Sequence, residues 1–266
     1  MTATTPVRLR VRRGSVQTTA ISLGFLALIL VMWQVLPTLL NTPSYVLPTL
    51  SNVLAALFDP AALPRYLDSA AVTMTEVFVG LGIGIAIGIV GAVVLTEVPI
   101  LYRILFPYIV AIESIPKVAL APLFIIWFGF GLPSKIVVVV LLTFFPILVN
   151  TLHGMKGVDP DRYELFRING ASRFQVLRKL ILPSALPSMF SGLELAMVNA
   201  MIGALVAEFV GAQKGLGVLI LQAQGRMDTA AVFALLIILS LIGIVLNLTV
   251  RFLRRKAIYW VAAEKG

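Results

Sequence analysis

The chain has 266 residues, of which 59% are hydrophobic and only 12% are charged, and its mean hydropathy is +1.01. A typical soluble domain has about a quarter charged residues, so this composition excludes an ordinary soluble enzyme, and the high apolar content excludes a disordered chain. The sequence has no cysteine and a single histidine, His153. These counts exclude disulfides, thiolate chemistry and a multi-histidine metal site within one chain.

Six stretches are long and apolar enough to cross a bilayer, which takes about 20 residues of helix. In chain order they cover residues 18–40, 69–95, 105–128, 134–152, 188–210 and 230–250. The third contains Glu113, Pro116, Lys117 and Pro122, so we expect a kinked or broken helix there. The sequence therefore predicts an all-α, polytopic membrane protein with six transmembrane helices.

The basic residues are divided unequally between the connections. Sixteen of the 21 Lys and Arg residues lie in the N-terminal segment, the second-to-third connection, the fourth-to-fifth connection and the tail. Four lie in the other connections, namely Arg65, Lys135, Lys214 and Arg226. Because positive charge marks cytoplasmic flanks, we expect a cell-membrane protein with both termini in the cytoplasm. The net charge of +9 is spread over four such flanks, which argues against nucleic-acid binding.

This pattern predicts three parts of the chain. Residues 1–17 form a basic cytoplasmic N-terminus, residues 18–255 form the transmembrane domain, and residues 256–266 form a cytoplasmic tail. The long connection between the fourth and fifth spans, about residues 156–187, is too polar to cross the membrane.

Local signals in this connection predict two short helices. Asp159 followed by Pro160 is typical of a helix start, and Gly170 can end that helix in the left-handed conformation. Ser172 and Gln175 form a capping-box pattern that starts a second helix, which we expect to end at Pro183. Taken alone, these signals also suit an amphipathic linker lying on the membrane surface.

The same connection resembles the cytoplasmic loop of permease subunits of bacterial ABC importers. That loop reads Glu-Ala-Ala, three residues, Gly, nine residues, then Ile-x-Leu-Pro; here the same frame holds Glu164-Leu165-Phe166, Gly170 and Leu180-Ile181-Leu182-Pro183. Both alanines and the isoleucine are replaced, but the spacing matches throughout. Further similarity, over about residues 70–255, is to the branch that imports nitrate, sulfonates, taurine, bicarbonate or pyrimidine compounds; it is carried by residues 121–123, 127–129, 170–173, 182–187, 207–208 and 215–217.

The resemblance implies a type I ABC importer fold and a non-enzymatic role. The loop would form coupling helices that dock on a separate ATPase subunit, and the residues concerned would be Glu164, Leu165, Phe166, Gly170, Ala171, Ser172, Leu182 and Pro183. ATP and magnesium would be bound by two copies of that ATPase, with no cofactor or metal on this chain. The other implied partners are the lipid bilayer, a second permease copy, most simply an identical one, and an extracytoplasmic solute-binding protein.

Ionisable residues inside spans are costly in a bilayer, so each is a candidate functional group. Glu76, Glu113, Lys117, Glu194 and Glu208 qualify. Glu113 and Lys117 are spaced to form an ion pair that stabilises a kinked helix, or Lys117 faces the pathway and attracts an anion. Glu208 either lines an outer gate or caps amide groups of the following loop.

The second span has glycines at four-residue steps, Gly80, Gly84 and Gly88, which predicts a face for close helix packing.

Two other functions fit the sequence less well. A secondary transporter driven by an ion gradient would be expected to show an internal repeat and paired mid-membrane carboxylates. An intramembrane protease would need a serine–histidine or double-aspartate centre, and His153 is the one available base.

Overall fold

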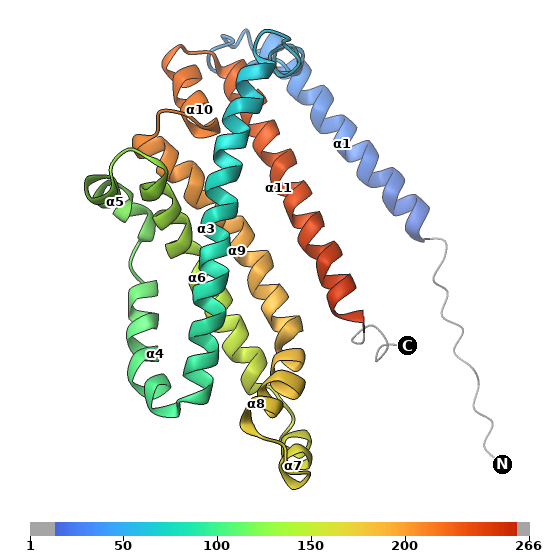
Figure 1. The fold of residues 1–266 in the computed structure, drawn as a ribbon. Helices are drawn as coiled ribbons and strands as arrows, with labels where there is room; N and C mark the ends of the chain where they lie inside the picture. The colour runs from blue at the N-terminus through green and yellow to red at the C-terminus, as the bar shows by residue number, and fades with distance from the viewer. Residues whose placement is uncertain (1–13, 260–266) are drawn as a thin grey trace, which may run out of the picture.

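The computed structural model describes residues 14–259, which form helices and no strand (Figure 1). The long helices are α1 (Gly14–Leu39), α3 (Leu63–Glu97), α6 (Leu132–Lys156), α9 (Leu182–Gly211) and α11 (Thr229–Ala257). The shorter ones are α2 (Leu50–Leu57), α4 (Pro99–Glu113), η1 (Lys117–Leu120), α5 (Ala121–Phe128), α7 (Pro160–Ile168), α8 (Arg173–Val176), η2 (Leu177–Ile181) and α10 (Leu216–Gly225). The predicted N-terminal segment and tail lie partly outside the described residues.

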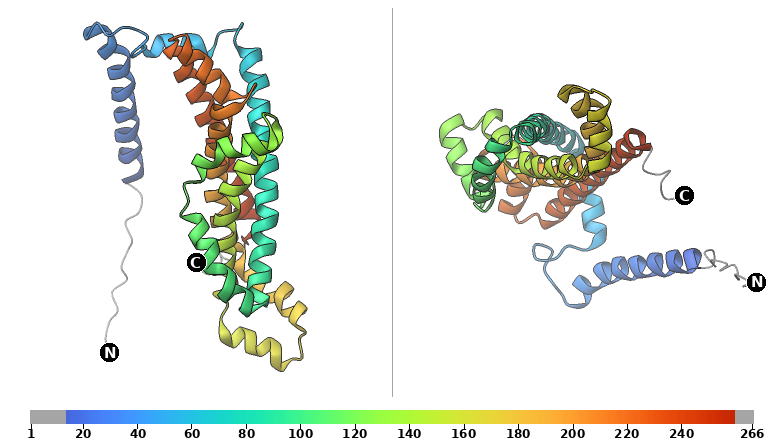
Figure 2. Two further views of the ribbon diagram at one scale, coloured as in Figure 1. Left: turned by 90° about the vertical axis from the view of Figure 1, so that its left-hand side faces the viewer. Right: turned by 90° about the horizontal axis from the view of Figure 1, so that it is seen from below.

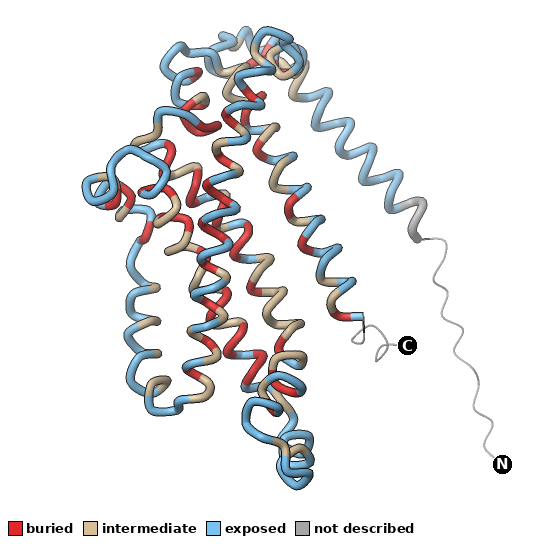
Figure 3. Tube along the Cα trace, viewed as in Figure 1, coloured by how far each residue is buried: buried red, intermediate tan, exposed pale blue. Residues whose placement is uncertain are grey.

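The core of the bundle consists of α6 packed between α3 and α9. Glycines allow this close approach: a Cβ at Gly80 would lie 2.5 Å from Val139 Cβ, and one at Gly88 would lie 2.8 Å from the Phe144 carbonyl oxygen. On the other side of α6, Gly192 of α9 faces the Pro146 carbonyl oxygen in the same way. The predicted glycine face is therefore confirmed, and it serves packing within the subunit. The segments of α3, α6 and α9 that face one another are largely buried (Figure 3).

The third span is broken, as predicted. The axis turns by 82° between α4 and the η1–α5 segment, with Pro116 in the break at φ −67° and ψ 87°. Proline lacks the amide hydrogen that would continue the helix. Among residues 14–259, five helices are long and apolar enough to cross a membrane, or six when this bent pair counts as one span. This result agrees with the six predicted spans.

Helix α1 stands apart from the bundle (Figure 2). The most apolar 18-residue stretch of α1 has no buried residue, which suits a surface in contact with lipid. The C-terminal part of α1 is fixed to the rest of the molecule: Trp33 Nε1 donates a hydrogen bond to the Pro48 carbonyl oxygen at 3.1 Å, and the Trp33 ring lies 5.3 Å from that of Phe233.

The two ends of the bundle carry different elements. Helices α7 and α8 project from one end, whereas α10 and the segment that leads into α3 lie at the other (Figure 1). Helix α1 begins, and α11 finishes, toward the α7 end of the molecule. Two short helices here, α2 and α10, were not predicted from the sequence.

One boundary was predicted wrongly. Pro183 does not end a short second helix, because α8 continues through the wide turn η2 directly into α9, and residues 173–211 form one helical run. The reason is the π-type hydrogen bonding of η2, in which the Leu182 N–H bonds to the Leu177 carbonyl oxygen, so that Pro183 falls in the first turn of α9, where a missing N–H costs little.

Candidate functional site

Helix α7 is defined by caps at both ends. The Asp159 side chain accepts a hydrogen bond from the Asp161 N–H at 2.9 Å, and Gly170 follows the helix with φ +72°. The Ala171 N–H then bonds to the Phe166 carbonyl oxygen at 3.0 Å and closes the turn. These features confirm the predicted start and end of the first short helix.

The second helix begins with the predicted capping box. The Gln175 N–H donates to Ser172 Oγ at 3.3 Å, and the Ser172 N–H donates to Gln175 Oε1 at 2.8 Å. A left-handed glycine thus lies between the end of α7 and the capped start of α8. The direction of α7 relative to the bundle consequently depends on the backbone at Gly170.

The apolar side chains of this segment divide into two sets. Phe166, Ala171 and Leu182 pack against the buried cluster at the end of the bundle, which includes Leu152 and Met155. In contrast, Leu165 is 59% exposed, Ile168 80% and Phe174 67%. The sequence motif pointed to Leu165 and missed Ile168 and Phe174. We call these three exposed residues the tip patch.

A cavity of about 700 Å³ lies between α7 and the ends of α3 and α6. Its lining includes Glu97, Lys156, Glu164, Arg167 and Arg173. The Lys156 ammonium lies 3.0 Å from the centroid of the Tyr102 ring. Glu164 is exposed at this surface, so its carboxylate is accessible to a partner.

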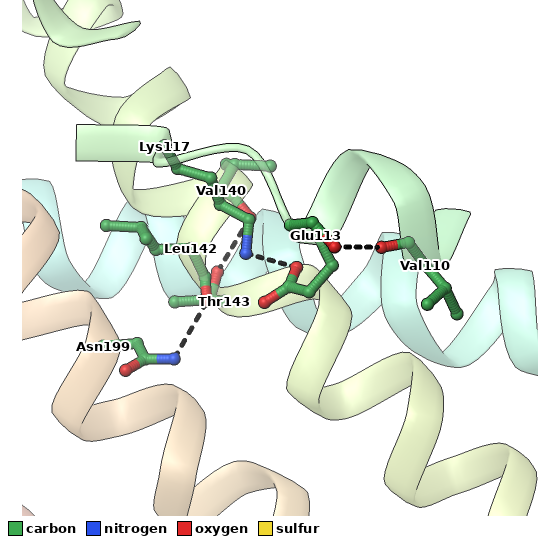
Figure 4. A network of polar contacts seen from close by, with 8 residues as sticks. Val110, Glu113, Lys117, Val140, Leu142, Thr143 and Asn199 are labelled. Atoms are coloured by element: carbon green, nitrogen blue, oxygen red, sulfur yellow. Dashed lines mark hydrogen bonds and ion pairs between the residues drawn. The ribbon is translucent and has the colours of Figure 1, made fainter. Parts of the chain in front are cut away.

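The break in the third span holds a charged pair (Figure 4). Lys117 forms an ion pair with Glu113, and its side chain is 7% exposed, against 30% for Glu113. The Lys117 ammonium also lies 5.7 Å from the Phe145 ring centroid. Nearby, Asn199 Nδ2 donates to the Leu142 carbonyl oxygen at 3.2 Å and ties α9 to α6. This geometry is that of a pair that stabilises a broken helix; a pathway role for Glu113 and Lys117 stays a prediction.

Glu208 lies near the end of α9 and is 1% exposed. Its Oε1 accepts a hydrogen bond from Thr73 Oγ1 at 2.6 Å, and its Oε2 accepts one from the Gly217 N–H at 2.5 Å. The Leu216 N–H donates in turn to Thr73 Oγ1 at 2.9 Å. Glu208 and Thr73 therefore satisfy the first free amides of α10, where negative charge is also favourable.

This arrangement corresponds to the amide-capping interpretation of Glu208, and its role as a gate stays a prediction. Gly215 has φ +134°, and a Cβ there would collide with the Glu208 carboxylate.

Sequence reasoning did not find two residues near this site, Thr73 and Lys135. Lys135 was expected in a connection, but it lies in the first turn of α6 and is only 3% exposed.

Comparison with known proteins is consistent over most of the chain. The family model "Binding-protein-dependent transport system inner membrane component" matches residues 80–259. The formylaminopyrimidine transport permease protein ThiX of Halalkalibacterium halodurans is 36% identical over 83% of this chain and 87% of its own length. The putative aliphatic sulfonates transport permease protein SsuC of Bacillus subtilis is 34% identical over 90% of this chain and 87% of its own length.

A solved structure shares the fold. An inward-facing form of the MetNI methionine ABC transporter superposes with a TM-score of 0.67 and 21% identity, covering 75% of this chain and 99% of that one. The chain belongs to the family of binding-protein-dependent transport system inner membrane components and is a permease subunit of an ABC importer.

Proposed function

We propose that this permease forms the translocation pathway of an ATP-driven importer and is coupled to a separate ATPase subunit through α7 and α8. The observation that carries the proposal is the tip patch. Leu165, Ile168 and Phe174 are large apolar side chains exposed on a polar segment that projects from the bundle (Figure 3). Large apolar side chains left exposed on a polar segment are typical of a protein–protein contact.

The chemistry of the segment suits docking into a groove on a partner. Glu164 beside the tip patch can accept charge-assisted hydrogen bonds, while Phe166 anchors α7 to the buried end of the bundle. A push on the tip patch is therefore transmitted to α6 and α9 through packed side chains. ATP and magnesium belong on the ATPase, since the sequence contains no G-x-x-x-x-G-K-[ST] phosphate loop.

We further propose two permease copies and two ATPase copies in each transporter. A groove of about 820 Å³ lies between α9 and α11 and is lined mainly by apolar side chains, with Ser240, Asn247 and Arg251 among them. Six spans in one chain are too few to enclose a pathway together with its gates. A second copy supplies the remaining wall, and Glu113, Lys117 and Glu208 are the candidate pathway or gate residues.

A solute-binding protein would deliver substrate at the end that carries α2 and α10. The names of the two relatives described above give different transported substrates, a formylaminopyrimidine for one and aliphatic sulfonates for the other. Their difference supports a permease that takes its specificity mainly from the binding protein. The substrate class proposed here is a small solute, a sulfonate, nitrate or related compound.

The docking proposal is tested by removing the apolar surface of the tip patch. Leu165→Ser combined with Ile168→Ser should leave membrane insertion intact, because neither side chain is buried, and should lower the amount of ATPase that co-purifies by at least about tenfold. Phe58→Ser is the matched control, since Phe58 is 73% exposed at the opposite end of the molecule. Equal ATPase recovery from the double variant and the control would contradict docking at the tip patch.

A further inference from the structure

A second buried carboxyl group, Glu76, lies beside Glu208 in the part of the bundle near α10. Glu76 is on α3 and is 1% exposed, as is Glu208. Glu76 follows Thr73 by about one helical turn on the buried face of α3, and the Thr73 hydroxyl donates to Glu208, so the two carboxyl groups face the same part of the α3–α9 contact and interact with one another. One oxygen of Glu76, Oε2, is completely buried and receives no hydrogen bond from any residue between 14 and 259. A buried polar atom in this condition requires an explanation.

The neighbours of the pair come from three elements, α3, α10 and α6. Helix α3 contributes Thr73, whose hydroxyl donates to Glu208, and α10 contributes the Gly217 N–H, which donates to the other Glu208 oxygen. Helix α6 contributes Lys135, which is close enough to interact electrostatically with both carboxyl groups. Its ammonium donates to the carbonyl oxygens of Phe130 and Gly131 at 2.6 and 2.9 Å. The ion pair of Lys214 with Asp68 lies nearby in the chain but is exposed to solvent.

The roles of the two acids are not equivalent. Glu208 accepts two short hydrogen bonds at a helix N-terminus, which favours its ionised form. Glu76 has no such donors. Two ionised carboxylates are both acceptors and cannot bond to one another, and one ammonium group balances one negative charge. A proton on Glu76 solves both problems. It supplies the donor for a hydrogen bond between the two carboxyl groups, and it removes the negative charge that Lys135 does not balance.

We propose that Glu76 and Glu208 form a proton-binding site, in which Glu76 carries the proton and donates it in a hydrogen bond to the Glu208 carboxylate. The ligand is a single proton. The resulting hydrogen bond links α3 to α9, and the bond from the Gly217 N–H to Glu208 extends this link to the start of α10. Glu76 is thus a positioning residue for the α9–α10 turn.

The proton can be observed directly by infrared spectroscopy of the full chain in lipid nanodiscs. The wild-type spectrum minus that of Glu76→Gln should contain the carbonyl stretching band of a protonated carboxylic acid. Asp68→Asn is the matched control, because Asp68 is an exposed acid on the same helix, and its difference spectrum should contain carboxylate bands only. If the Glu76→Gln difference spectrum also contained only carboxylate bands, the proton site would be refuted.

Thermal unfolding supplies a second, independent measurement. Glutamine imitates a protonated glutamate in shape and can donate to Glu208, so Glu76→Gln should change the unfolding temperature by less than about 3 °C. Glu208→Gln should lower it by about 5 °C or more, because its amide group turns a donor toward Thr73 or the Gly217 N–H. The assignment of the proton to Glu76 would be overturned if Glu76→Gln lowered the unfolding temperature more than Glu208→Gln did. It would also be overturned if the Glu76→Gln protein failed to fold. Neither measurement depends on ATPase docking or transport.

Discussion

At the scale of single residues, Gly170 controls the direction of α7. Its φ of +72° belongs to the left-handed region, and nothing lies within 4 Å of the point where a side chain would begin. The requirement for glycine is therefore conformational and not steric. Valine reaches this region only with strain, whereas asparagine reaches it more easily.

Replacing Gly170 by valine and by asparagine tests whether this position requires the left-handed backbone conformation. Gly170→Val should cost on the order of 1 to 3 kcal/mol locally and re-aim α7, so reconstituted transport and substrate-stimulated ATP hydrolysis should both be lost at normal membrane levels. Gly170→Asn is the matched variant and should keep most of the activity. If the valine variant transported as well as the asparagine variant, the coupling role of this turn would be wrong.

At the scale of elements, the packing of α3 on α6 depends on which glycines face the neighbour. A Cβ added at Gly88 would lie 2.8 Å from the Phe144 carbonyl oxygen and 2.9 Å from Ile147 Cβ. A Cβ added at Gly82 would meet no atom within 4 Å. Both residues lie on the same helix, so their helix propensity is equal and only the contact differs. A backbone carbonyl oxygen cannot move aside as a flexible side chain can.

Alanine at these two positions should therefore act in opposite directions. Gly88→Ala should lower the free energy of unfolding by about 1 to 3 kcal/mol through overpacking. Gly82→Ala should leave it unchanged or raise it by up to about 1 kcal/mol through better helix propensity. Thermal unfolding of the two detergent-purified variants checks this expectation. Similar losses in both would show that α3 and α6 are not packed in this register.

At the scale of the whole molecule, the two ends of the bundle should face different compartments. The α7 end carries most of the basic residues of the described chain, among them Arg162, Arg167 and Arg173, and positive charge favours the cytoplasmic side. The broken third span still counts as one crossing in this topology, so α1 begins and α11 ends on the same side.

Single cysteines can test the orientation, because the natural chain has none. Phe58→Cys at the α2 end should react with a membrane-impermeant thiol reagent in intact cells, and Ile168→Cys at the α7 end should react only after the membrane is opened. Both side chains are more than 70% exposed on the permease, so in cells that express it without its ATPase their access to the reagent differs only by compartment. Labelling of Ile168→Cys in intact cells would reverse the topology.

The sequence by itself determined the features whose signals are local in the chain. The spans follow from hydropathy, because a bilayer core demands about 20 apolar residues of helix wherever they occur. The caps at Asp159, Gly170 and Ser172 involve atoms a few residues apart, so their geometry could be predicted from the residue types. The break near Pro116 follows from a missing amide hydrogen.

The tertiary structure alone decided the features that depend on contacts between distant segments. The burial of Lys135, the contact between Glu76 and Glu208, and the direction of the glycine face toward α6 each depend on how α3, α6 and α9 are packed. The same holds for the continuation of α8 through η2 into α9, where the wide turn avoids the missing amide of Pro183. Capping signals reach only three or four residues along the chain and hydropathy signals only the length of one span, so they do not identify which helices meet or which buried polar groups must share a hydrogen bond.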